Sequence, residues 1–271
     1  MPENPAIQKA REMAAAHGNT GGADARKPGP EQTQGEQKVV PLPLWSTQEY
    51  GAPVAMLRSA LFGVIKRGRR PFLENEPINS WPDLAVTYTG KRLDQADLDV
   101  WLQSVQLHQE QRAAGLGSEI HFQITPFLRE IRRHTGSQNI KWLQESIGRL
   151  VEGTVYIETK EREYGGHLID DFDLSKKTGL YVLRINPKMA AMFDYGWSKL
   201  ELEARLSLGR SQLHKALHGF LCSHKASPKR PLKVGHERLT GLFGEGYSRR
   251  RDFLRETRKV LADLKGQGFL R

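Results

Sequence analysis

Residues 237–264 are ERLTGLFGEGYSRRRDFLRETRKVLADL, and this stretch decides the fold of the C-terminal part of the chain. Apolar spacing predicts one helix over 237–243 and a second over 248–264, with a Gly-rich turn at 244–247 between them. One face of the second helix is apolar at helical spacing; it holds Leu254, Thr257, Leu261 and Leu264, with Phe253 and Val260 at its edge. The pattern is that of a helix–turn–helix whose second helix packs by this face.

The opposite face of the second predicted helix is basic. It carries Ser248, Arg251, Arg255 and Lys259 at spacings of three and four, flanked by Arg249 and Arg258. Such a helix has the geometry of a recognition helix in the DNA major groove. We expect Arg251 and Arg255 to contact bases, and Ser248, Arg258 and Lys259 to contact phosphates, with Ser248 as the helix cap. The alternative is a solvated basic face on an ordinary surface helix.

The charge distribution supports a polyanionic partner. Residues 197–271 hold 17 Lys and Arg against 7 Asp and Glu, whereas residues 1–196 hold 24 of each sign. Concentrated positive charge on one segment favours binding to phosphates through counterion release. A further basic group, Lys229, Arg230 and Lys233, is predicted on a loop before a short strand at 231–234, where it either holds backbone phosphate or is simply solvated.

The rest of the chain predicts an α+β fold with two tandem winged-helix domains. Residues 1–50 are predicted to be a disordered tail, residues 51–196 the first winged-helix domain and residues 197–271 the second, basic one. Helices are expected at 54–65, 94–111, 126–133 and 137–151, and strands at 83–89, 120–124, 154–158, 167–172 and 180–185. In the first domain, the recognition helix begins with Ser137, Gln138, Asn139 and Lys141, which we also predict to contact DNA. This helix is less basic, which indicates a weaker DNA contact or, alternatively, a protein contact.

Several function classes lack support in the sequence. No apolar run approaches the roughly 18 residues of a membrane helix. The single cysteine, Cys222, allows no internal disulfide and fits a reducing bacterial cytoplasm. No Walker A motif occurs, and His214, His218 and Cys222 are more simply explained as packed helix residues than as a metal site. We therefore expect no enzyme activity, cofactor or metal.

Several stretches resemble the TrfA family of plasmid replication initiators. They are 57–62 (LRSALF), 86–90 (VTYTG), 93–102 (LDQADLDVWL), the helix–turn–helix at 127–150 and the segment 231–264, in the same order as in that family. The resemblance spans about residues 50–270. It implies two winged helices, binding to direct repeats (iterons) at a plasmid origin, opening of an AT-rich element, a monomer–dimer equilibrium, and recruitment of DnaA and the replicative helicase.

The resemblance also implies a partner for the tail. Some TrfA-like proteins carry a sliding-clamp motif just before the first domain, and the matching place here is the apolar segment 39–45, with Leu42, Leu44 and Trp45. Pro41 replaces the leading Gln of that motif. Either the β sliding clamp binds this segment, or Leu44 and Trp45 fold back onto the first domain.

The sequence therefore predicts a DNA-binding initiator of plasmid replication. The alternative is a winged-helix transcriptional repressor, including one that represses its own gene. The arrangement of bound sites distinguishes them, because direct repeats favour an initiator and one palindrome favours a repressor.

Overall fold

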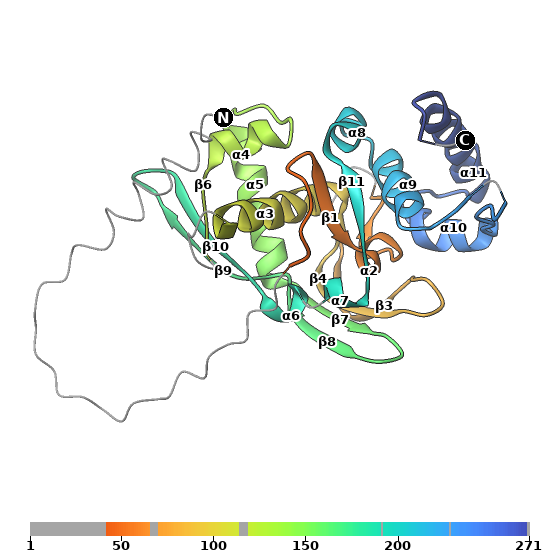
Figure 1. Ribbon diagram of the computed structural model, residues 1–271, viewed down its shortest axis with the longest axis horizontal. Coiled ribbons are helices and arrows are strands. Elements are labelled where there is room, and N and C mark those ends of the chain that lie inside the picture. The colour runs from red at the N-terminus through yellow and green to blue at the C-terminus, as the bar shows by residue number, and fades with distance from the viewer. Residues whose placement is uncertain (1–41, 66–69, 114–118, 191, 228, 270–271) are drawn as a thin grey trace, which may run out of the picture.

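The computed structural model describes residues 42–65, 70–113, 119–190, 192–227 and 229–269 (Figure 1). At its centre lies helix α3 (Gln95–Ala113), which is buried along most of its length, with Trp101 fully inaccessible. The helix predicted at 94–111 is confirmed, and Asp94 caps it. The Asp94 carboxylate accepts hydrogen bonds from the backbone N–H groups of Ala96 (2.9 Å) and Asp97 (3.1 Å), and the Asp97 side chain accepts one from the backbone N–H of Asp94 (3.0 Å).

The first helix–turn–helix unit is built on α3. The chain continues through β6 (Ile120–Gln123), α4 (Ile124–Glu130) and α5 (Ser137–Glu152), and later adds β9 (Ile169–Ser175) and β10 (Leu180–Ile185). The three strands form an antiparallel sheet in the order β6-β10-β9. Phe122 of β6 stacks on Tyr181 of β10 at 5.3 Å and contacts Phe127 of α4 at 4.5 Å. This succession of helices and strands is that of a winged helix.

A four-stranded antiparallel sheet lies beside this unit. Its order is β3 (Phe72–Ile78), β4 (Ala85–Lys91), β7 (Thr154–Glu158) and β8 (Glu163–His167). Val86, Tyr88, Val155 and Ile157 point into the core, whereas Tyr156 between the last two is 45% exposed. The sequence predicted β4 and β7 but not the edge strands. β3 carries several charged or exposed residues and β8 contains two glycines, so neither shows an apolar alternation.

The segment expected to be one helix over 54–65 is broken. It forms α2 (Val54–Leu57) and then β2 (Phe62–Gly63), which pairs in parallel with β5 (Leu93–Asp94). The guanidinium of buried Arg92 donates to the carbonyls of Ala60 (2.5 Å) and Leu61 (2.7 Å). These carbonyls are therefore occupied by a side chain instead of by a helical N–H.

The second unit follows short helices α6 (Pro187–Ala190) and α7 (Met192–Tyr195) and strand β11 (Trp197–Glu201). It consists of α8 (Leu202–Ser207), α9 (Gln212–Cys222), α10 (His236–Phe243) and α11 (Arg250–Gly266). The strand predicted at 231–234 is wrong, because the chain there is irregular and Leu232 and Val234 pack half-buried against the helices. Phe269 is not in a strand but meets the ring of His218 at 4.9 Å, and the last two residues lie outside the described part.

The α+β class is confirmed, and the apolar side chains form two clusters. The larger surrounds α3 and includes Leu200 of β11, while the smaller joins Val64 to residues of α9, α10 and α11. The domain limit at residue 196 stays a prediction, and β11 crosses it by pairing with β1 (Glu49–Pro53). Of the tail predicted at 1–50, residues 1–41 lie outside the described part. The disorder expected for residues 42–50 is wrong, because Trp45 is buried and β1 begins at Glu49.

Candidate nucleic-acid interface

Helix α11 separates its apolar and basic residues cleanly. Phe253, Thr257, Val260 and Leu264 are buried, whereas Arg251, Arg255, Arg258 and Lys259 are exposed on the opposite side. Leu254 and Leu261, which the sequence placed at the centre of the packed face, are only half-buried at its margin. The packed stripe is thus rotated by about 50° from the predicted one, half the angle between successive residues of a helix, and the two stripes share Thr257 and Leu264. The predicted basic face nevertheless remains open to solvent.

Packing at the start of α11 fixes the direction of this face. The ring of Phe253 lies 5.4 Å from that of Tyr247 in the preceding turn, and Phe243 at the end of α10 lies 5.5 Å from Phe220 of α9. Arg250, which was not among the predicted DNA contacts, hydrogen-bonds to His236 and lies 3.8 Å from Glu237, both on α10. The two helices of the turn are therefore held by apolar and polar contacts.

The predicted cap by Ser248 is wrong. Helix α11 begins at Arg250, its N-cap is Arg249, and no side chain caps it. Ser248 and Arg249 are exposed in the turn, so the first backbone N–H groups of α11 have no side-chain acceptor. Free N–H groups at a helix start are a favourable site for a phosphate. Both residues remain at the surface that faces solvent beside Arg251.

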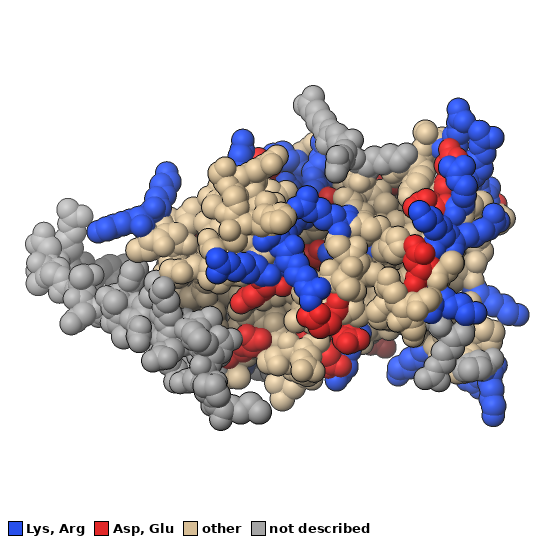
Figure 2. Space-filling view, turned by 90° about the horizontal axis from the view of Figure 1, so that it is seen from above, with Lys and Arg blue, Asp and Glu red and all other residues tan. Residues whose placement is uncertain are grey.

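Two other features of the basic surface bear on DNA binding. Arg255 is 77% exposed and meets Asp252, one turn earlier, at 3.1 Å. An exposed pair of this kind is weak and exchanges readily for a phosphate or base. Lys229, Arg230 and Lys233 are also exposed, with Arg230 in an isolated bridge to Ser227. Figure 2 shows Lys and Arg gathered over the end of the molecule that contains α9–α11.

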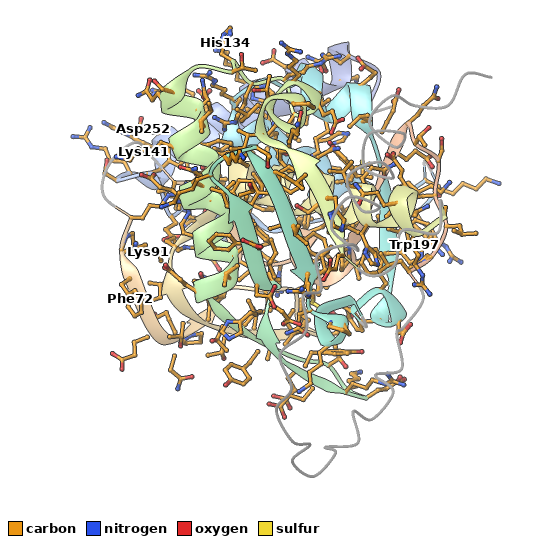
Figure 3. All side chains as sticks on the ribbon, turned by 90° about the vertical axis from the view of Figure 1, so that its left-hand side faces the viewer. Phe72, Lys91, His134, Lys141, Trp197 and Asp252 are labelled. Atoms are coloured by element: carbon orange, nitrogen blue, oxygen red, sulfur yellow. The ribbon has the colours of Figure 1, made fainter. Side chains whose placement is uncertain are left out.

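The first predicted recognition helix, α5, is also exposed on its outer side. Ser137, Gln138 and Lys141 are exposed, whereas Asn139 is half-buried. In Figure 3, Lys141 of α5 and Asp252 of α11 lie at the same edge of the molecule, although the two helices are well apart in Figure 1. The two labelled residues thus lie on the same side of the molecule, at a distance from one another.

A buried ion network anchors α5 to α3. Asp97 is fully inaccessible and accepts from Arg149 (2.7 Å) and Ser146 (2.6 Å) of α5 and from Arg70 (2.8 Å). Burial, followed by the charge of Asp97, raises the pKa of neighbouring Asp94, which Arg70 opposes from 2.7 Å. Arg70 thus serves this internal network, and residues 66–69 directly before it lie outside the described part.

Ion pairs also join the two helix–turn–helix units. Asp99 of α3 accepts from Arg205 of α8 (2.8 Å) and Lys215 of α9 (2.5 Å), and all three are buried. Arg92 pairs with Glu245 in the α10–α11 turn at 2.6 Å. The sequence analysis treated 94–99 only as a helix start. Three carboxylates within six residues, directly before an apolar stripe, were the signal that could have revealed these contacts.

The segment expected to meet a sliding clamp is largely folded onto the core. The Trp45 ring stacks on Phe193 at 5.5 Å, and its indole N–H donates to Gln106 at 2.6 Å. Leu42 is partly buried against the same cluster, whereas Leu44 is 83% exposed. Trp45 thus follows the fold-back alternative, whereas Leu44 does not. A clamp contact through all three residues requires Trp45 to leave the core.

The structure also describes His214, His218 and Cys222, the residues weighed above as a metal site. Among the described residues no group of His, Cys, Asp and Glu is arranged to hold a metal ion. His218 is buried, and burial lowers its pKa to about 4. Cys222 is exposed at the end of α9, and partial desolvation of its thiol raises its pKa. No helix in the described ranges is long and apolar enough to cross a bilayer.

Comparisons with known proteins identify a shared fold. No protein-family model matches the chain, and no curated protein matches it at a significant level. A crystal structure of selenomethionine derivatives of domains 2 and 3 of RctB matches with a TM-score of 0.51 and 14% identity, covering 74% of this chain and 82% of that one. A second crystal structure of RctB domains 2–3 matches with a TM-score of 0.51 and 11% identity, covering 76% and 82%.

Proposed function

We propose that this protein is a DNA-binding replication initiator that uses α11 as its main recognition helix. The observation that carries the proposal is the position of Arg251, Arg255, Arg258 and Lys259, all exposed on the side of α11 opposite its buried stripe. A helix held by one face and basic on the other fits the major groove, where arginine pairs with guanine and lysine binds phosphate. The likeness to RctB domains 2 and 3 supports an initiator role at the general level.

The finer parts of the proposal rest on the resemblance to TrfA-type initiators. They are the binding of iterons at a plasmid origin, the opening of an AT-rich element, a monomer–dimer equilibrium, and the recruitment of DnaA and the replicative helicase. The exposed outer side of α5 supports a second DNA contact by Gln138 and Lys141. Two recognition helices on one chain suit a site that spans more than one major-groove segment.

Footprinting on the DNA that flanks the protein's own gene, at about 150 mM salt, tests the proposal. We expect protection of several evenly spaced direct repeats beside an AT-rich stretch. A matched variant, Arg251→Gln with Arg255→Gln, should lose this protection, whereas Arg112→Gln at the exposed end of α3 should keep it. Protection of a single palindrome would instead support the repressor, and no specific protection by freshly diluted protein would contradict both.

A further inference from the structure

A cleft lies between the two helix–turn–helix units. One wall comes from the α4–α5 turn and α5, with Arg132, Arg133 and Trp142, and another from the α8–α9 turn, with Arg210 and Ser211. The start of α3 forms its floor, and Tyr247 and Glu256 of the second unit also line it. Three arginines thus converge on one hollow. The sequence analysis assigned none of them a role.

Most charges at this cleft are already neutralised within the protein. On its floor, Asp94 accepts from Arg70 (2.7 Å) and Gln212 (3.0 Å), and Asp99 accepts from Arg205 and Lys215. Arg132 pairs with Glu203 of α8. Arg133 and Arg210 form no ion pair with a carboxylate in the ranges that the structure describes. These two side chains are therefore the cations of the cleft that remain for an outside anion.

The backbone turns sharply directly before each of these two arginines. Arg132 adopts φ +52°, an uncommon left-handed conformation for a residue other than glycine, and Gly209 adopts φ +61° directly before Arg210. The Arg133 guanidinium lies 3.4 Å from the centre of the Trp142 ring, which fixes its plane. Burial lowers the pKa of Arg133, the charge of Asp99 opposes this, and the charge of Arg210 adds to the lowering. The charges of Asp94 and Asp97 also oppose this lowering.

We propose that Arg133 and Arg210 bind backbone phosphates of the DNA segment that passes between the two recognition helices. The inference rests on the proposed function. Trp142 and Glu256 line the cleft and directly follow Lys141 on α5 and Arg255 on α11, so the cleft lies next in sequence to both predicted DNA-binding surfaces. A duplex in contact with both helices passes this cleft. The planar guanidinium, with its fork of N–H donors, matches the oxygens of a phosphate.

The test uses the duplex defined by footprinting and a scrambled duplex of equal length, titrated from about 50 to 300 mM salt. The variants are Arg133→Gln and Arg210→Gln. The matched control is Arg112→Gln, an exposed arginine about 24 Å along α3 from Ala96 at the cleft. Each variant should weaken binding to both duplexes about fivefold at 150 mM salt and reduce the slope of log K against log salt by about 0.9. The control should match wild type.

Arg210→Gln decides the test if Arg133→Gln disturbs the turn through its contact with Trp142, because Arg210 is exposed. Affinity and salt slope equal to those of Arg112→Gln would overturn the inference while leaving recognition by α11 intact. Wild-type protein that shows no specific DNA binding would overturn the proposed function itself. A third outcome is that inorganic phosphate raises the melting temperature of wild type but not that of a protein carrying both Arg133→Gln and Arg210→Gln, while these substitutions leave DNA affinity unchanged. In that case the inference is overturned, because the cleft binds a small anion instead of DNA.

Discussion

Arg255 and Lys259 lie on one exposed helix face but should behave differently. Arg255→Ala should cost about 1–3 kcal/mol of binding free energy and relax the sequence preference, because a bidentate contact to a guanine is lost. Lys259→Ala should weaken binding to all sequences alike and lower the salt slope by about 1, because it removes a phosphate contact. Anisotropy titrations on specific and scrambled duplexes measure both, with Lys265→Ala at the far end of α11 as the control. Equal losses on both duplexes for Arg255→Ala would exclude a base contact.

His218 should make the stability of the second unit depend on pH. In the unfolded chain its imidazole binds a proton near pH 6.5, whereas burial, reinforced by Arg205, lowers the pKa in the folded protein to about 4. The free energy of unfolding should therefore fall by up to about 3 kcal/mol as the pH drops from about 6.5 to 4, and no further below that. Urea denaturation at several pH values across this range measures the fall in the free energy of unfolding. His218→Gln should flatten the profile, and exposed His134→Gln should not; identical profiles for all three would contradict the burial argument.

At the scale of one helix, packing of α11 depends on which residues form its buried stripe. Phe253 is fully inaccessible, whereas its neighbour Leu254 is half-buried. Phe253→Ala should lower the free energy of unfolding by about 3–5 kcal/mol and Leu254→Ala by clearly less, in urea denaturation. A larger loss for Leu254→Ala than for Phe253→Ala would contradict this packing. It would indicate that the buried stripe is centred on Leu254 and Leu261, as apolar spacing alone suggested.

The sequence predicted the long helices and the strands of alternating apolar pattern, and it placed the basic face of α11 on the correct side. It missed elements that depend on distant partners. β3 and β8 become strands by pairing with β4 and β7, and β1 by pairing with β11, although none has a strong pattern of its own. The predicted strand at 231–234 failed for the opposite reason, since its apolar residues found helices to pack against and no neighbouring strand.

At the scale of the molecule, buried charges join the two helix–turn–helix units. Asp99→Ala would leave Arg205 and Lys215 buried without their carboxylate, at a cost of about 3–5 kcal/mol. We expect calorimetry to show a lower melting temperature and a transition that broadens or splits, because the second unit loses its two buried ion pairs with α3. Asp173→Ala, at an exposed carboxylate, should leave the melting curve unchanged. An unchanged curve for Asp99→Ala would show that the ion pairs of Asp99 do not couple the units.

The cleft arginines lay outside the reach of sequence analysis for a related reason. Arg133 and Arg210 are 77 residues apart, and only the docking of the second unit on α3 brings their two turns to one hollow. Trp45 shows the same dependence, since its position beside an apolar tail suggested a partner protein until its contact with Phe193 and Gln106 was seen. Local pattern identifies a face of a helix, but the fold decides which faces meet.

The most direct test of the account compares sequence discrimination in two proteins. Wild type and the Arg251→Gln, Arg255→Gln double variant are titrated at about 150 mM salt on the footprinted duplex and on a scrambled duplex. We predict that wild type prefers its site by at least about 10³-fold and that the variant loses most of this preference while keeping weak binding to any duplex. A variant that still discriminates as wild type does would contradict the role of α11 as the recognition helix.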